Sequence, residues 1–474
     1  MTAVSRAWGR LTLPGKVVFT IVPLLVLLTI ALVVAIGLFG TLVVDILIAN
    51  IGIVRFVVAV TIILLLSPPI AFVIIYMEMK IIALMNLRLG PDRVGPWGTL
   101  LSTVHGLKVL MKEDFTPTGA DAVVFTWAPV VVFASTIMAV LVIPFAPGLF
   151  GQDMNIALLY FFAVGGLTIV GLLMAGWSSF NKYSLLGGLR SAAQIVSYEI
   201  PLTLSVVGLL ILAGTMSLNQ LVELQGPHLD AATGQMTGAW FTDWFVFRQP
   251  LGFLIFFIAA TAEGNRTPFD LTEADSEIVA GFGTEYSGMR FGFFYFAEYI
   301  NVFVLSALTV VLFLGGWNAP FDINGIFAWL NSVQSVVTFP TAFAWDVNPA
   351  AVGLPLLFIV ALAPVLATLI LGAPFYLLRS STKWWHAILI GFVLFNVLVV
   401  GLLLVWAYVN FEWAAGLFWF LGKTFAFVYL FVWLRGTLPR VRIDQLMGFA
   451  WKWLLPASLL NLFVTAAAVL VIGG

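Results

Sequence analysis

The chain has 474 residues, of which 62% are hydrophobic and only 9% are charged, and its formal net charge is −1. A soluble domain carries roughly 25% charged residues, so a water-exposed surface of this composition would aggregate. The near-neutral charge argues against a nucleic-acid partner. Because the chain has no cysteine, it cannot form disulfides, thiolate nucleophiles, cysteine-ligated zinc sites or protein-held iron–sulfur clusters.

Apolar stretches dominate the chain, and eleven of them reach the roughly 20 residues that a helix needs to cross a bilayer. They lack two-residue alternation, which favours helices over a barrel. The first is too long for a cleaved signal peptide, so we expect an anchor. The sixth is the weakest, because Arg248 and Pro250 lie near its start. The stretches are 17–43, 56–77, 122–145, 156–176, 191–213, 245–263, 291–315, 353–378, 385–409, 413–434 and 453–472. The sequence therefore predicts an all-α, polytopic transmembrane helix bundle.

The basic residues give this topology an orientation. With the N-terminus in the cytoplasm, only Arg55, Arg248 and Lys423 of the 21 Lys and Arg residues fall on the opposite side. Such asymmetry is what the positive-inside rule predicts. The inner loops at 78–121, 177–190, 263–290 and 435–452 also hold nearly every distinctive polar residue, so the functional surface is predicted to face the cytoplasm.

The first inner loop contains a turn-rich connector, 88–98, followed by a predicted helix over 99–113. Its apolar side chains share one side of the helix. The other side carries His105, Lys108 and Lys112. Because the segment is too short and too polar to span, we expect an amphipathic helix lying in the membrane interface.

The third inner loop, 263–290, is the most unusual, because six of its residues are acidic: Glu263, Asp270, Glu273, Asp275, Glu277 and Glu285. Thr267 and Asp270 form a capping pair that predicts a short helix after Pro268. Asp270, Glu273 and Glu277 would line one face of that helix. One interpretation is a solvated acidic face, or one buried against a basic partner subunit. The other is a carboxylate cluster that titrates together and couples proton movement to a nearby event.

Three carboxylates, Glu199, Glu263 and Glu298, lie inside predicted spans or at their edges. An ionised carboxylate in hydrocarbon is costly, so such residues face protein or water and often mark a proton path. The alternative is a neutral, hydrogen-bonded side chain that only fixes helix packing. The sequence contains no nucleotide-binding motif, nucleophile elbow or metal-ligand spacing, so we expect no metal site and no complete active site in this chain.

Four sequence blocks, in order, resemble a known family. They are RLGPDRVGP at 88–96 with KVLMKE at 108–113; WSSFNKY at 177–183 with AQIVSYEIP at 193–201; EGNRTPFDLTEADSE at 263–277 with AEY at 297–299; and RGTLPR at 435–440 with DQLM at 444–447. The chain resembles the H subunit of the proton-pumping NADH–quinone oxidoreductase, respiratory complex I, the family of its mitochondrial subunit 1. The 263–277 block is the most specific.

The resemblance implies a role at the junction of the hydrophilic and membrane arms of a bacterial cell-membrane complex. It implies a quinone-access tunnel with candidates Arg88, Arg93, Arg266, Asp270, Glu273, Asp275 and Glu277. It implies a proton path through Glu199, Glu263 and Glu298. Quinone would be the substrate, no cofactor would be bound by this chain, and FMN and iron–sulfur clusters would belong to partner subunits.

The chain departs from the family pattern at several positions. Met79 stands where the family has a basic residue, His105 where it usually has an acid, and Ile443 where it usually has Tyr. The family core has about eight spans, so 17–43, 353–378 and 385–409 are extra. We therefore expect an added anchor in 1–55, a core over 56–317, an insertion over 318–412 and two further core spans in 413–474.

Two other functions stay open at this point. One is a subunit of a related membrane hydrogenase, or of another oxidoreductase with a different donor and acceptor. The other is a secondary transporter, although neither inverted repeats nor interrupted helices in matching halves are evident. A pure scaffold would follow if the acids serve only in packing.

Overall fold

The computed structural model describes residues 51–226, 228–229, 236–237, 243–270, 279–320 and 412–472. Contacts divide the chain into residues 1–61 and 62–474; of the first unit, only the beginning of one helix is described. The three extra spans predicted at 17–43, 353–378 and 385–409 lie outside the described residues, as do Glu273, Asp275 and Glu277.

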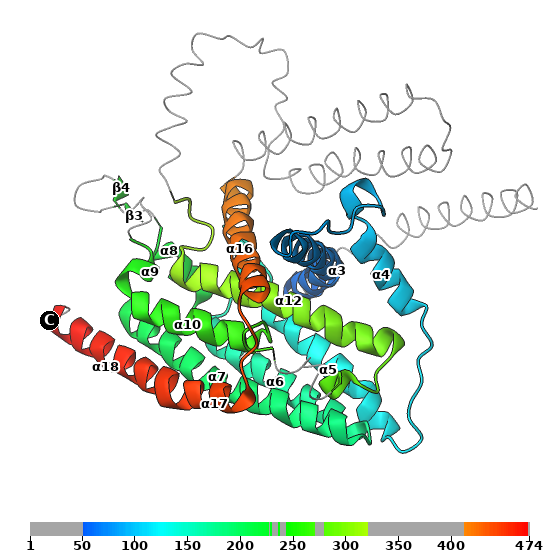
Figure 1. Ribbon diagram of the computed structural model, residues 1–474. Helices are drawn as coiled ribbons and strands as arrows, with labels where there is room; N and C mark the ends of the chain where they lie inside the picture. The colour runs from blue at the N-terminus through cyan, green and yellow to red at the C-terminus, as the bar shows by residue number, and fades with distance from the viewer. Residues whose placement is uncertain are drawn as a thin grey trace, which may run out of the picture. The chain divides into compact units, whose positions relative to one another are not determined.

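The described chain is mainly helical (Figure 1). Seven of its helices are long and apolar enough to cross a membrane, which confirms the predicted all-α polytopic class. The long helices are α3 (Ile51–Met85), α5 (Ala122–Val140), α6 (Ala157–Ser178), α7 (Lys182–Ala213), α12 (Gly288–Phe313), α16 (Glu412–Thr437) and α18 (Leu455–Ile472). Shorter helices are η1 (Pro96–Gly98), α4 (Leu101–Leu110), α8 (Leu218–Glu223), α9 (Phe245–Arg248), α10 (Pro250–Glu263), η3 (Gly281–Gly283), α17 (Ile443–Phe449) and the π-helical turn η4 (Ala450–Leu454).

Strands are confined to two short antiparallel pairs within the described residues. β1 (Pro144–Ala146) pairs with β2 (Leu149–Phe150), and β3 (His228–Leu229) pairs with β4 (Met236–Thr237). Both pairs lie in loops between helices, and Phe145 of β1 packs against Phe420 of α16 at the edge of the helical core.

Two predicted elements differ in extent from the structure. The predicted span at 245–263 is broken at Gln249, because Pro250 has no backbone N–H and starts a new helix, α10. The predicted interfacial helix over 99–113 is shorter and runs over Leu101–Leu110 as α4. Most of α4 is exposed, with Ser102 its one buried residue.

Helix ends follow local capping rules. Asp121 accepts hydrogen bonds from the backbone N–H groups of the first turn of α5, at 3.2 Å from Val123 N, and Asn181 does so for α7, at 2.9 Å from Tyr183 N. α7 ends at Gly214, whose φ of +71° is a left-handed conformation that glycine adopts without a side-chain clash.

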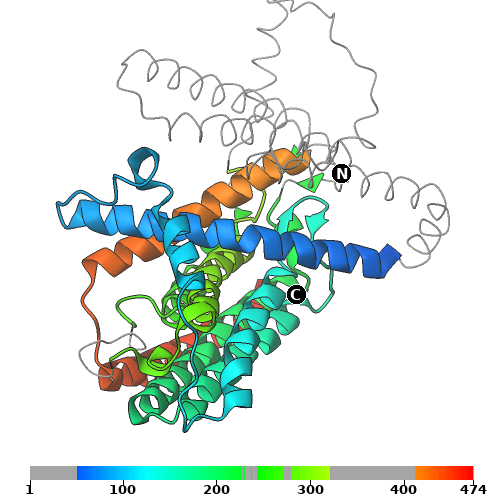
Figure 2. The same ribbon diagram turned by 90° about the vertical axis from the view of Figure 1, so that its right-hand side faces the viewer.

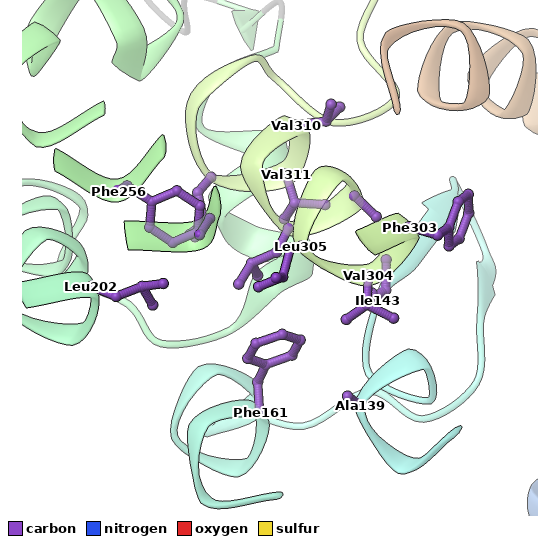
Figure 3. Packing of buried hydrophobic residues seen from close by; sticks show 14 of the residues in the cluster. Ala139, Ile143, Phe161, Leu202, Phe256, Phe303, Val304, Leu305, Val310 and Val311 are labelled. Atoms are coloured by element: carbon purple, nitrogen blue, oxygen red, sulfur yellow. The ribbon is translucent and has the colours of Figure 1, made fainter. Parts of the chain in front are cut away.

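α12 is the central helix of the core. Every residue from 302 to 313 is buried, so this stretch is apolar on all sides and surrounded by protein. Lipid tails are as apolar as these side chains, so close van der Waals packing, more than exclusion of water, holds such a bundle together. In Figure 3, side chains from α5, α6, α7 and α10 gather around those of α12, and the labelled neighbours include Ala139, Phe161, Leu202 and Phe256.

Of the other long helices, α5 packs closely against α12. α5, α6 and α7 run side by side (Figure 2), and α18 packs along α7. α16 lies against α12. This arrangement brings residues from α3, α10, α12 and α16 to one end of the bundle, where the charged side chains gather.

Candidate functional site

Six charged side chains meet at one end of the bundle and form what we term the charge cluster: Glu78, Arg266, Asp270, Glu298, Arg435 and Arg440. Glu78, on α3, is at the centre of these ion pairs. Its Oε2 accepts a hydrogen bond from Arg266 Nη1 at 3.1 Å, and its Oε1 accepts a short one from Arg435 Nη1. The cluster holds three acids and three arginines, so its charges balance.

Arg266 is the most buried member of the cluster, with 2% of its surface exposed. Its Nη2 lies 3.4 Å from Glu298 Oε1, and its guanidinium lies 4.5 Å from the centre of the Tyr299 ring. Burial opposes its charge, but Glu78 and Glu298 outweigh that effect, so the pKa of Arg266 lies above its usual value. One cation is therefore shared between two carboxylates on different helices.

Asp270 connects the turn after α10 to the segment after α16. Its Oδ2 accepts a hydrogen bond from Arg440 Nη2 at 3.1 Å and lies 4.0 Å from Arg435 Nη2. Close by, Val441 N donates to the Pro268 carbonyl at 3.0 Å. Asp270 was predicted to cap a helix. That helix would lie in residues outside the described part of the chain, and the Asp270 side chain is buried in these ion pairs.

The turn that carries Arg266 and Asp270 is held in place by Gln194 of α7. Gln194 Nε2 donates to the carbonyls of Ala262 at 2.7 Å and Phe269 at 2.8 Å, at both ends of the turn. Gln194 is buried, so these bonds satisfy backbone groups that water does not reach. The side chain therefore fixes the position of the loop relative to α7, the helix that also carries Glu199.

A cavity of about 80 Å³ adjoins the charge cluster. The cavity is large enough for several waters, since one water needs roughly 10–15 Å³ of such space. Glu263 and Glu298 both line it, and so do the polar side chains Asn265, Asn301, Ser135 and Thr168. Ser135 donates to the Val164 carbonyl at 2.6 Å and lies 2.9 Å from the Thr168 hydroxyl. Glu298 thus belongs to both the charge cluster and the cavity.

Glu199 is half-buried on α7 and does not line this cavity, but it is near enough to Glu263 for their charges to interact. Arg88 and Arg93 are exposed in the connector before α4 and take no part in the ion pairs of the charge cluster. The structure therefore brings together Arg266, Asp270 and Glu298, with Glu263 beside them, and leaves the two connector arginines apart.

The far end of the 263–290 loop is anchored on α5 and α7. Asn181 Nδ2 donates to Glu285 Oε1 at 2.6 Å, and Ser184 donates to the Phe282 carbonyl at 3.0 Å. The Tyr286 ring stacks on Phe125 at 4.1 Å, and its hydroxyl donates to the Phe125 carbonyl. Burial raises the pKa of Tyr286 to about 12, although Ser178 and Arg290 oppose the shift, so the phenol stays protonated and able to donate.

Comparisons with known proteins decide the family. The sequence profile of the family described as NADH dehydrogenase matches residues 57–466. The chain is 38% identical over 399 residues to the NADH-quinone oxidoreductase H subunit of Dehalococcoides mccartyi, covering 84% of this chain and 82% of that protein. It is 41% identical to the corresponding H-1 subunit of Koribacter versatilis, covering 82% and 86%. The chain belongs to the H-subunit family of NADH-quinone oxidoreductases.

Membership makes the chain a membrane subunit of complex I, an oxidoreductase built from several subunits. The resemblance inferred from the four sequence blocks is thereby confirmed. The apolar helices agree with an integral membrane protein. The relatives' names also favour an NADH-quinone oxidoreductase over the hydrogenase and transporter alternatives.

Sequence reasoning missed several residues of the site in this complex I chain. Glu78, Arg435 and Arg440 were not among the candidates, although each supplies an ion pair of the charge cluster. Glu78 did carry a signal, because it directly follows the apolar stretch 56–77 and falls inside α3. Its partner Arg266 is 188 residues away in sequence, so no local pattern could pair them.

Proposed function

We propose that this subunit forms much of the quinone-access tunnel of its complex and begins the buried carboxylate path that couples quinone reduction to proton translocation. The observation that carries the proposal is the double position of Glu298. It pairs with Arg266 in the charge cluster and also lines the cavity that holds Glu263. One carboxylate therefore links the charged end of the bundle to a space able to hold water.

Such a link suits the chemistry of quinone reduction. Reduction of a quinone to a quinol takes two electrons and two protons, and the electrons would come from the partner subunits. Consumption of protons beside Asp270 and Arg440 would change the local charge. Because Arg266 is shared by Glu78 and Glu298, a change at Glu78 alters how strongly Arg266 holds Glu298. A released Glu298 would take up a proton from waters in the cavity.

From Glu298 the proposed path runs across the cavity to Glu263 and on to Glu199, whose charge acts on Glu263. Arg266 and Asp270 would form the wall of the tunnel next to the charge cluster. Glu273, Asp275 and Glu277 would extend that wall. Arg88 and Arg93 are exposed beside the apolar connector residues Leu87 and Leu89, which suits a place at the tunnel mouth, toward the partner subunits.

The substitution Glu298→Gln in the complete complex tests the proposal. Gln keeps the size of the side chain but cannot take up and release the proton that the path would carry. We expect an assembled complex whose proton translocation per electron falls, measured in sealed membranes with NADH and a quinone. The matched control is Glu223→Gln, an exposed acid at the end of α8. Normal translocation in the Glu298 variant would refute the path.

A further inference from the structure

Lys423 is a basic residue within a membrane-spanning helix, toward the face that the basic-residue asymmetry assigns to the outside. It lies on α16, about 15 Å along the helix from Trp413. Among the described residues no carboxylate lies within ion-pair distance of its ammonium group. An ionisable side chain inside a spanning helix is costly and needs a reason. Its partners show what that reason is.

The Lys423 ammonium group binds the end of α12. Nζ donates to the carbonyls of Leu314 at 2.7 Å and Asn318 at 2.8 Å. It also lies 4.7 Å from the centre of the Trp244 ring, a cation–π contact. The Leu314 carbonyl is at the C-cap of α12, where carbonyls lack partners within the helix and carry partial negative charge, so a cation there is stabilising, and the Asn318 carbonyl belongs to the turn that follows. We term Lys423, Trp244 and these two carbonyls the lysine clamp.

Gln225 reinforces this end of α12. Its Nε2 donates to the Val311 carbonyl, and its Oε1 accepts from Gly315 N, each at 3.0 Å. Gly315 has a φ of +69°, and a Cβ on it would meet the Trp244 ring at 2.6 Å. The backbone after α12 is therefore tightly enclosed, and it offers its carbonyls to a lysine that reaches across from α16.

The same two helices supply members of the charge cluster at some distance from the lysine clamp. α12 carries Glu298, about 24 Å from Leu314 along the helix axis, and α16 carries Arg435, about 18 Å from Lys423. α12 and α16 are thus joined at one end by the lysine clamp and meet through Glu78 and Arg266 at the other. α3, which carries Glu78, packs on α12 through Phe72 and Phe296. A shift of α16 relative to α3 and α12 would therefore separate Arg435 from Glu78.

We propose that Lys423 is a positioning residue for the charge cluster. The lysine clamp fixes α12 and α16 to each other at one end, so that Glu298 and Arg435 meet Arg266 and Glu78 in register. When ion pairs in the charge cluster change, the charged ends of the two helices move about this fixed point. The functional part of this inference rests on the proposed coupling role of the charge cluster.

The test uses Lys423→Met in the complete complex, with Lys423→Arg as the conservative variant. Lys452→Met, on the exposed face of η4, is the control for loss of one lysine. Hydrogen exchange measured by mass spectrometry would follow peptides covering 311–318 at the lysine clamp and 436–446 beside the charge cluster. Quinone reduction with NADH would be measured over a range of quinone concentrations.

With Lys423→Met we expect faster exchange in both peptides, because the fixed point is lost. We expect kcat to fall about five-fold, with KM for quinone within about two-fold. Lys423→Arg should keep exchange in both peptides and kcat close to the wild-type values, since Arg retains a positive charge and hydrogen-bond donors. Lys452→Met should change neither the exchange rates nor kcat. Faster exchange confined to 311–318 would reduce Lys423 to a local cap and overturn the proposal. A fall in kcat without faster exchange in 436–446 would overturn it as well.

A second variant covers the case in which Lys423→Met prevents assembly. Trp244→Leu removes the indole face but leaves the hydrogen bonds from the ammonium group to the two carbonyls. We therefore expect faster exchange in both peptides and a fall in kcat of about two-fold. No change in the 436–446 peptide of this variant would count against the proposal. The Glu298→Gln experiment separates the two ideas: normal proton translocation there would defeat the carboxylate path, whereas the exchange pattern would still report the link between clamp and cluster.

Discussion

At the scale of single residues, the site depends on buried charges that compensate one another. Glu78 alone contacts two arginines, Arg266 and Arg435, and only a small part of each of these side chains is exposed. Removing one member of a buried ion pair leaves an uncompensated charge, which typically costs about 3–5 kcal/mol. Glu78, which neutralises both arginines, is therefore expected to affect stability as well as function.

The substitution Glu78→Gln should destabilise the complex, because Gln cannot neutralise two guanidinium groups. We expect a loss of about 3 kcal/mol or more in stability, seen as less assembled complex on native gels and earlier thermal dissociation. Asp444→Asn, an exposed acid on α17, is the control. An unchanged yield and dissociation temperature for Glu78→Gln would show that the arginines find other partners.

The substitution Glu199→Gln should act on function and spare assembly. Glu199 is half-buried, and no ion pair within the described residues depends on it. We expect lower quinone reductase activity, because the variant cannot carry a proton along the proposed path. Activity normalised to the amount of assembled complex would be compared with that of the wild type. Full turnover in an assembled variant would remove Glu199 from the path.

At the scale of elements, the 263–290 loop is positioned by close backbone contact as well as by side chains. A Cβ on Gly187 of α7 would lie 2.5 Å from Gly281 Cα in η3, so the two backbones touch. Gly187→Ala should push η3 away at a cost of about 1–3 kcal/mol. We expect lower thermal stability and faster proteolysis of the loop. Gly166→Ala, on α6 with nothing within 4 Å of the new methyl, should be neutral.

Sequence patterns predicted most helices because each long apolar run needs only its own composition to form a helix in lipid. They failed at 245–263, where Pro250 divides one expected span into α9 and α10. They found Arg266, Asp270 and Glu298 through one distinctive motif block and the resemblance that it supports. They could not find the pairing of Glu78 with Arg266 and Arg435, because those contacts arise only when α3, α10 and α16 pack together.

At the scale of the whole molecule, the asymmetry of basic residues predicts the orientation in the membrane. The chain has no native cysteine, so a single introduced cysteine reports its own location within this subunit. We expect a membrane-impermeant thiol reagent to label Asn155→Cys, in the loop before α6, in intact cells. Asp92→Cys, in the connector after α3, should react only after the membrane is opened. The reverse pattern would invert the predicted topology.

The shortness of α10 has an electrical consequence. Its 14 residues span about 21 Å, whereas the hydrocarbon core is about 30 Å thick. Glu263, its last residue, would then sit part-way through the membrane field. One elementary charge crossing the whole field is worth about 2.3 kcal/mol per 100 mV, so a proton arriving at Glu263 should sense a fraction of that. Turnover would be measured in proteoliposomes under imposed diffusion potentials. Its voltage dependence should correspond to less than one elementary charge for the protonation of Glu263. The Glu263→Gln variant should lose this part of the voltage dependence.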